Sequence, residues 1–221
     1  ECLEKSERLS VTHEMEVPDK GSVIFRSDLI PLEAREEMPP GVLMVSQDIS
    51  ETIKERQQRE RIMRQLVSTL VSVVDRRDPY SANHSIHVGQ VAHAVAEEMG
   101  LEDSLVEAVE IAGNLMNLGK ISVPEDVLTK TERLTEEEVV MIRDSVLTSA
   151  DLIKSIEFDG PVEETLRQLL ENYDGSGVPN GLKGEDIAIT ARVVAAANSF
   201  VGMVSARSWR PGMDIDDAVN T

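Results

Sequence analysis

Few residues in this sequence are of types that act in catalysis or bind metal ions, and these residues lie far apart in the chain. The single cysteine, Cys2, excludes an internal disulfide and a zinc site made of thiolates. His84 could be a metal ligand, but it shares an apolar helical face with Val88 and Val91. A histidine in that setting is more simply a buried residue bonded to a neighbouring amide such as Asn117, and we favour that interpretation.

Phosphate is the other ligand that these residue types could bind. The glycine-rich stretch 174–184 could surround phosphate oxygens with its backbone amides. Near the end of the chain, Arg207 and Arg210 could hold a phosphate with their guanidinium groups. Both arginines could equally pair with the aspartates of residues 214–217, so phosphate binding and ion pairing stay open as alternatives.

The balance of charge limits the class of ligand. With 41 acidic and 22 basic residues, the 221-residue chain has a net charge of −19, which would repel a phosphate backbone. A general nucleic-acid binder is therefore excluded. Hydrophobic residues make up 41% of the chain and aromatic residues only 3%, so we expect one fair-sized core built from aliphatic side chains.

The distribution of apolar residues argues against a membrane segment. The longest apolar run, 193–204, is interrupted by polar residues and glycine and is too short to span a bilayer. The sequence has no signal peptide and opens at Glu1, which suggests a piece of a longer protein. With one cysteine in addition, we expect a cytoplasmic protein without membrane contact in this segment.

Two different patterns precede the region that contains most of these residues. Residues 1–50 alternate apolar and polar side chains and predict three strands, too few to close a domain without missing chain or another subunit. Residues 51–76 predict one long helix beginning near Ser50. The first half of that helix has too few apolar positions to be buried, which indicates a solvated connector or a short two-chain coiled coil.

Residues 77–221 have the pattern of a compact set of helices. Ser81 can cap one helix, and Thr135 and Glu138 form a capping box before another. The glycine-rich stretch then precedes a final helix from about 188 to 205. The sequence as a whole indicates a mainly α protein, an all-helical bundle behind a long helix and a small β fragment.

The glycine-rich stretch resembles the signature loop of the HD-GYP family, with Val178 in place of the family's tyrosine. The matching loop residues are Asp174, Gly175, Gly177, Pro179, Asn180, Gly181 and Gly184. Further landmarks agree in order and spacing, namely Leu118-Gly119-Lys120-Ile121, Thr135-Glu136-Glu137-Glu138, Asp78-Pro79-Tyr80-Ser81 and Arg207-Ser208-Trp209-Arg210. The resemblance covers about residues 60–221. It implies an HD-type helical bundle in which the loop is a structural element and a partner-docking surface more than a phosphate-binding loop. Members of the family bind divalent metals and hydrolyse cyclic di-GMP, a bacterial second messenger.

The resemblance also implies where the metal ligands would lie, and most of them are replaced. The family's ligands fall on His84, Met116, Asn117, Asp144, Leu169, Leu170 and Asn198. Only His84 is unchanged, and only Asp144 is another plausible donor. The asparagines keep the shape of an aspartate without its charge, and the methionine and leucines are apolar. We therefore expect no catalytic residues and no cofactor, with a divalent metal such as Fe or Mn only if that interpretation is wrong.

The resemblance assigns phosphate contacts to three cations. Lys120 corresponds to a family lysine that would neutralise a substrate phosphate, and a lysine interacting with a helix C-terminus is an equal alternative. Arg207 and Arg210 match a basic pair that contacts phosphate in the family. These three residues are the candidates for binding a nucleotide.

A weaker resemblance concerns the first region. Residues 41–46, followed by Asp48-Ile49-Ser50-Glu51, resemble the last strand and exit motif of a PAS sensor domain. We therefore expect a partial PAS-like sensor fragment at 1–50, a signalling helix or linker at 51–76 and a degenerate HD-GYP domain at 77–221.

Together these resemblances predict a bacterial signal-transduction module, a catalytically inactive HD-GYP protein that acts through protein contacts. We expect a homodimer through the helix of residues 51–76, and the resemblance suggests a GGDEF-type protein as a partner. Two alternatives stay open. One is a receptor that binds cyclic di-GMP without hydrolysis, and the other is an active metal-dependent cyclic di-GMP phosphodiesterase with a non-standard site.

Overall fold

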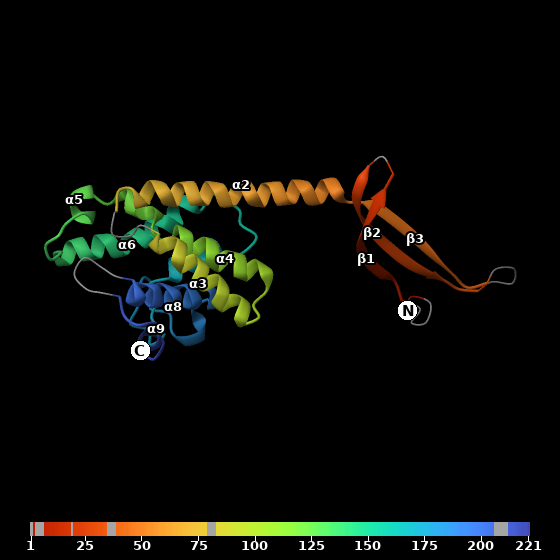
Figure 1. Cartoon of the computed structure of the whole chain (residues 1–221). Coiled ribbons are helices and arrows are strands. Elements are labelled where there is room, and N and C mark those ends of the chain that lie inside the picture. The colour runs from red at the N-terminus through yellow and green to blue at the C-terminus, as the bar shows by residue number, and fades with distance from the viewer. Residues whose placement is uncertain (1, 3–6, 19, 35–38, 79–82, 206–211) are drawn as a thin grey trace. The chain divides into compact units, whose positions relative to one another are not determined.

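The computed structural model describes residues 2, 7–18, 20–34, 39–78, 83–205 and 212–221. The chain divides into two compact units, residues 1–64 and 65–221, with the division inside helix α2. The elements are β1 (Leu9–Val17), β2 (Gly21–Leu32), β3 (Gly41–Asp48), α2 (Ser50–Asp75), α3 (His84–Glu98), α4 (Asp103–Leu115), η1 (Leu118–Ser122), α5 (Glu125–Leu128), α6 (Glu136–Ile153), α7 (Val162–Gln168), η2 (Gly184–Asp186), α8 (Ile189–Val204) and α9 (Ile215–Val219) (Figure 1). The chain is mainly helical with one small sheet, as the sequence predicts.

The first unit contains an antiparallel sheet with the strand order β1-β2-β3, which confirms the three predicted strands. In the central strand, Val23 is only 4% exposed. The register puts Val11, Met15 and Met44 on the same face of the sheet as Val23, yet these three side chains are 45%, 49% and 61% exposed. The described residues therefore leave much of this apolar face uncovered.

Hydrogen bonds at Ser50 attach the start of α2 to the sheet. The backbone N–H of Ile24 in β2 donates to the Ser50 hydroxyl (2.8 Å), and the backbone N–H of Ser50 donates to the Asp48 carboxylate (3.0 Å). The hydrogen bonds from Ser50 also hold the pKa of Asp48 below its usual value. The transition from strand to helix is thus fixed by Asp48 and Ser50, two residues apart in sequence, and by the bond from Ile24 in β2.

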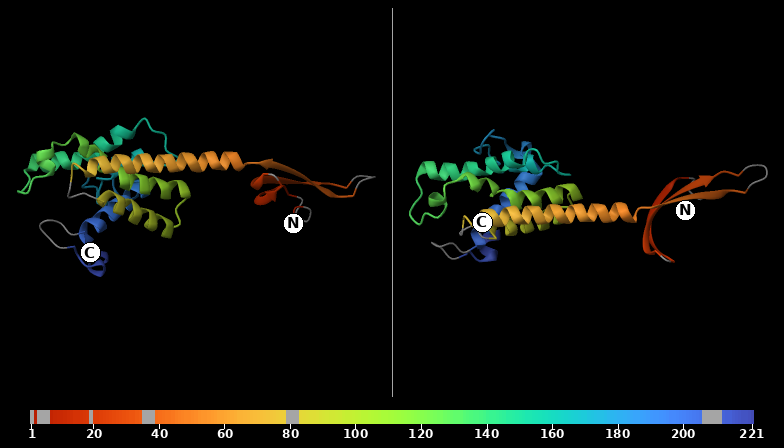
Figure 2. Two further views of the ribbon diagram at one scale, coloured as in Figure 1. Left: turned by 45° about the horizontal axis from the view of Figure 1, so that its top comes forward. Right: turned by 90° about the horizontal axis from the view of Figure 1, so that it is seen from above.

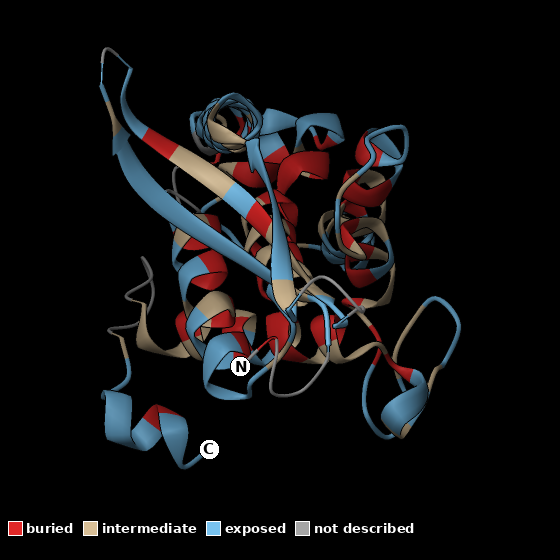
Figure 3. Ribbon diagram, turned by 90° about the vertical axis from the view of Figure 1, so that its right-hand side faces the viewer, coloured by how far each residue is buried: buried red, intermediate tan, exposed pale blue. Residues whose placement is uncertain are grey.

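Three helices, α3, α4 and α8, form the centre of the second unit and lie side by side in Figures 1 and 2. The first two approach most closely at glycines: a Cβ on Gly113 would lie only 2.8 Å from the Cα of Gly89. Val88, Val109 and Val194, one from each helix, are fully buried between them. In Figure 3 the buried residues of this unit lie on the sides of the helices that face one another. The aliphatic core that the composition predicts is therefore present.

Helix α6 begins at the predicted capping box and packs against η1. The Thr135 hydroxyl accepts from the Glu138 backbone N–H (3.3 Å), and the Glu138 carboxylate accepts from the Thr135 backbone N–H (2.7 Å). Lys130 also binds that carboxylate and lowers the pKa of Glu138. Further along the helix, the Ser149 hydroxyl accepts from the Gly119 backbone N–H (2.7 Å). Local capping fixes the start of α6, and η1 holds its middle.

Two features of the second unit differ from the prediction or fall outside it. Helix α8 agrees with the expected final helix, but the short helix α9 follows it and was not predicted. The carboxylate of Asp214 caps α9 by accepting from the Asp216 backbone N–H (3.0 Å). Ser81, the expected helix cap, lies outside the described residues. Within the described ranges, no helix has both the length and the apolar character needed to cross a bilayer.

Candidate functional site

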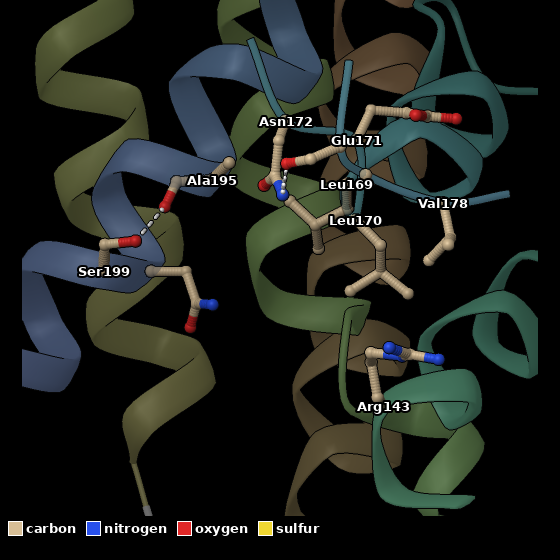
Figure 4. A pocket seen from close by; sticks show the side chains of 11 residues that line it. Arg143, Leu169, Leu170, Glu171, Asn172, Val178, Ala195 and Ser199 are labelled. Atoms are coloured by element: carbon tan, nitrogen blue, oxygen red, sulfur yellow. Dashed lines mark hydrogen bonds between the residues drawn. The ribbon is translucent and has the colours of Figure 1, made fainter. Parts of the chain in front are cut away.

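A pocket of about 300 Å³ lies beside the end of α7, the signature loop and α8 (Figure 4). The residues that line it are Arg143, Leu169, Leu170, Glu171, Asn172, Ser176, Gly177, Val178, Ala195, Asn198 and Ser199. Three positions to which the resemblance assigns metal ligands, Leu169, Leu170 and Asn198, are therefore in the lining. Gly177 and Val178 of the signature loop join them. The fold brings together residues that the sequence analysis selected from separate segments.

His84 reaches this group through Asn198. Its Nε2 atom lies 2.9 Å from Oδ1 of Asn198, so the tautomer with the proton on Nε2 donates to the amide oxygen. His84 stands at the start of α3 and is 9% exposed. The expectation of a buried histidine bonded to an amide is met, but the partner is Asn198 and not Asn117. The fold makes this pairing because α3 and α8 pack together.

Asn117 and Met116 lie just after α4, and both are buried. The side-chain amide of Asn117 donates to the hydroxyl of Ser85 (2.9 Å), the residue after His84. The backbone carbonyl of Met116 accepts from the Ser149 hydroxyl in α6 (2.9 Å). These two positions therefore connect α4 to α3 and α6 through neutral groups.

Asp144 does not line the pocket. It lies on α6 with its side chain half-exposed, and its carboxylate is 3.3 Å from the guanidinium of Arg143. An exposed ion pair of this kind contributes little to stability. Asp144 is therefore separate from the positions around His84 and Asn198.

The residues at these positions do not fit the metal centre that the resemblance implies. Divalent metals need several imidazole and carboxylate donors that converge on one point. Leu169 and Leu170 offer no donor, and the neutral amide of Asn198 is bonded to His84. In the part of the chain that the structure describes, no three His, Cys, Asp or Glu side chains form a group that could hold a metal ion.

The signature loop is held by a buried carboxylate at its base. Glu171 is 6% exposed, and its two oxygens accept from the backbone N–H groups of Asn180 (2.7 Å) and Leu182 (3.0 Å). At Gly177 the loop also passes very close to the backbone of Asn172. A Cβ on Gly177 would lie only 2.2 Å from the Asn172 backbone nitrogen. These contacts give the loop one conformation around a charged acceptor.

A second carboxylate, that of Asp174, fixes the first turn of the loop, residues 174–176. The Asp174 carboxylate accepts from the hydroxyl (2.6 Å) and the backbone N–H (2.9 Å) of Ser176, and these bonds hold the pKa of Asp174 below its usual value. Between them Gly175 has a φ of +84°, a conformation that favours glycine. The backbone N–H of Val178 donates to the carbonyl of Leu170 (3.1 Å), and this bond holds Val178 at the pocket wall.

Of the three predicted phosphate-binding cations, the structure describes Lys120, which does not line the pocket. Lys120 lies in an ion pair with Asp78, with 2.8 Å between Nζ and the carboxylate, and both side chains are nearly buried. Separating such a pair is costly, because it leaves a nearly buried charge without its partner. Arg207 and Arg210 lie outside the described residues.

Arg143 is a cation of the pocket lining that the sequence analysis missed. Its side chain is 47% exposed, and Figure 4 shows it on the same side of the pocket as Leu170 and Val178. The sequence signal was its place directly before Asp144, a position to which the resemblance assigns a ligand. Arg143 adds a positive charge to a lining that also contains the Glu171 carboxylate and several neutral polar side chains.

Residues 45–221 match the HD domain family, and the match covers most of the chain. The chain belongs to the HD domain family. Among curated proteins it is similar to the cyclic di-GMP phosphodiesterase response regulator RpfG of Xanthomonas campestris pv. campestris, with 32% identity over 196 residues that cover 87% of this chain and 51% of that protein. It is also similar to the 3′3′-cGAMP-specific phosphodiesterase 1 of Vibrio cholerae, with 29% identity over 161 residues that cover 73% of this chain and 37% of that protein. The chain thus spans about half the length of these relatives or less.

Solved structures agree with the fold. A crystal structure of a cyclic GMP-AMP-specific phosphodiesterase from V. cholerae superposes with a TM-score of 0.52 and 18% identity, over 70% of this chain and 42% of that one. At this identity the likeness concerns the arrangement of helices alone. The helical unit is therefore an HD-type bundle.

Proposed function

We propose that this chain is a signalling module of the HD-GYP type that has lost metal-dependent hydrolysis and acts through protein contacts. One observation carries the proposal. At the positions assigned to the metal ligands, the pocket wall offers two leucines, and Asn198 is bonded to His84. The relatives named as phosphodiesterases support the signalling role.

The physical reason is the energy of burying charge. A cluster of carboxylates and imidazoles without its metal would leave buried polar groups uncompensated. Leu169 and Leu170 remove that penalty with apolar surface. The pairs His84–Asn198 and Asn117–Ser85 give hydrogen-bond partners to Nε2 of His84 and to the side-chain amide of Asn117. The former ligand positions therefore form part of a pocket wall without a cluster of charged donors.

In this proposal the first region is a partial PAS-like sensor, and the helix of residues 51–76 passes its state to the degenerate HD-GYP domain at 77–221. The same helix pairs two copies of the chain, and a GGDEF-type protein is the partner class for the output. The connection of Ser50 to β2 and Asp48 supports direct transmission from the strands to α2.

The second candidate function is a receptor that binds cyclic di-GMP without hydrolysis. Arg143 favours it, because a guanidinium in the pocket lining could pair with a nucleotide phosphate. The ion pair of Lys120 with Asp78 argues against it, because a phosphate would have to compete with a nearly buried carboxylate. An active phosphodiesterase with a non-standard site is the third candidate, favoured by the relatives' activities.

Titration calorimetry with cyclic di-GMP separates these candidates. We expect no saturable heat with the ligand at high micromolar concentration. If binding does occur, Arg143→Ala should weaken it at least about tenfold, since a charge-assisted phosphate contact would be lost. Arg133→Ala is the matched control, because Arg133 is an exposed arginine that does not line the pocket. Tight binding that depends on Arg143 would contradict the proposal of an interaction module and favour the cyclic di-GMP receptor.

A further inference from the structure

Strand β3 forms one edge of the sheet in the first unit, because among the described strands only β2 pairs with it (Figure 1). Its apolar side chains alternate between the two faces of the sheet and are exposed on both. Val42 and Met44 on one face are 39% and 61% exposed, and Leu43 and Val45 on the other face are 47% and 53% exposed. An open apolar edge strand of this kind is a template for pairing with a further strand.

The register of the sheet shows which backbone groups of β3 point away from β2. Just beyond β3, the backbone N–H of Ile49 donates to the carbonyl of Ile24 in β2 (2.9 Å). In an antiparallel pair, residues that bond to the neighbouring strand alternate with residues that do not. The residues of β3 whose N–H and carbonyl groups point outward are therefore Val42, Met44, Ser46 and Asp48.

Two details of β2 agree with this alternation. Pro31, which has no N–H, lies opposite Val42, at a position that donates no bond to β3. Ser27 lies opposite Ser46, and their hydroxyl oxygens are 2.7 Å apart, as suits the closer spacing of a pair without backbone hydrogen bonds. The N–H groups of Val42, Met44 and Ser46 thus have no acceptor among the described residues.

The opposite edge of the sheet, strand β1, has a protection that β3 lacks. By the same alternation, the outward backbone groups of β1 belong to residues 10, 12, 14 and 16. Two of these, Glu14 and Glu16, are charged, and charges along an edge oppose pairing with another strand. In β3 the only charged residue is the last one, Asp48. A further strand is therefore expected at β3 and not at β1.

We propose that β3 pairs edge to edge with β3 of a second copy of the chain, in antiparallel direction and centred on Val45. A second copy fits because β3 itself is what the edge requires, an extended apolar strand that is uncharged before Asp48. A two-fold axis perpendicular to the sheet makes two identical edges antiparallel. A two-fold axis along the strands would make them parallel, but it would set each N–H against the same N–H of the other copy. The antiparallel direction thus follows from the identity of the two edges.

The outward groups also determine the register. With Val45 on the axis, Met44 exchanges hydrogen bonds with Ser46 of the second copy, and Val42 exchanges them with Asp48 of the second copy. Every outward group of β3 then has a partner. The two Asp48 carboxylates lie at opposite ends of the pairing, so they do not oppose it.

Other registers leave outward groups without partners. Moving the axis by one residue towards the start of β3 would put Asp48 opposite Pro40, which has no N–H to donate. Moving it by one residue in the other direction would put Val42 opposite Ser50, the first residue of α2. The centre at Val45 therefore gives the longest ladder of hydrogen bonds.

Cysteine cross-linking of the full chain at about 100 μM, well above a micromolar affinity, tests direction and register together. In a Cys2→Ser background, Val45→Cys should form a disulfide-linked dimer under mild oxidation, because the two Cα atoms of such a pair lie about 4.5 Å apart. Leu43→Cys should not cross-link to itself, but should do so when mixed with Gln47→Cys, the position opposite to it. Cross-linking of Leu43→Cys to itself as fast as Val45→Cys, or none at Val45, would overturn the proposal.

Proline on each edge separates pairing from chance collision. Added to the Val45→Cys chain, Met44→Pro removes an outward N–H without removing a bond to β2, and should slow the cross-linking about tenfold or more. Thr12→Pro is the matched control, because it removes an outward N–H from β1 and should leave the rate unchanged. Equal rates in the two variants would contradict pairing through β3. This pairing does not rest on the proposed function, so its failure would leave the calorimetry and the question of metal untouched.

Discussion

Gly119→Ala is expected to destabilise the helical unit more than alanine at any other described glycine, because its Cβ would make the shortest contact. A Cβ on Gly119 would lie 1.9 Å from the backbone oxygen of Ser145 and 2.7 Å from the backbone nitrogen of Ser149. Both atoms belong to α6, so neither can move without shifting that helix. The shift would also break the hydrogen bond from the Gly119 amide to the Ser149 hydroxyl. We expect a loss of about 3 kcal/mol or more in the free energy of unfolding, the upper range for overpacking.

Thermal denaturation followed by circular dichroism checks this result. A loss of that size should lower the melting temperature by about 6–12 °C in a unit of this length. Gly41→Ala is the matched control, because a Cβ there meets no described atom within 4 Å and Gly41 lies in the other unit. A Gly119→Ala protein that melts with the wild type would show that η1 does not pack against α6 in this way.

Glu171→Ala should release the signature loop. The substitution removes the acceptor of the Asn180 and Leu182 backbone N–H groups, and each buried donor left unpaired costs about 1–3 kcal/mol. We expect a total loss of about 3 kcal/mol. Glu171→Gln keeps one acceptor oxygen and should lose roughly half as much.

Hydrogen exchange at the amides of Asn180 and Leu182 reads this effect directly. Their protection should fall strongly in Glu171→Ala and less in Glu171→Gln. Glu185→Ala is the control, because Glu185 is an exposed carboxylate in the short helix that follows the loop. Unchanged protection in Glu171→Ala would mean that the loop holds its shape without the buried carboxylate.

Much of the fold could be predicted from the sequence because its signals are local. Alternating apolar residues predicted the strands, the helical period predicted α2, and Thr135 with Glu138 predicted the start of α6. The short helix α9 was missed because its five residues carry little periodic signal.

The site could be predicted only in part, because its contacts are not local. The resemblance selected His84 and Asn198, but 114 residues separate them, and only the packing of α3 on α8 pairs them. The partner of Lys120 was missed for the same reason, since Asp78 precedes it by 42 residues. Arg143 was missed because the resemblance selects its neighbour Asp144, and only the three-dimensional packing places Arg143 and not Asp144 in the pocket lining.

The central claim is that the positions around His84 no longer hold catalytic metal, and one measurement tests it most directly. The full chain is loaded with Fe²⁺ or Mn²⁺, freed of unbound metal, and analysed for metal per chain by mass spectrometry. We expect far less than one ion per chain, and the same value for His84→Ala. A stoichiometric ion in the wild type that is lost in His84→Ala would contradict the claim and favour an active phosphodiesterase.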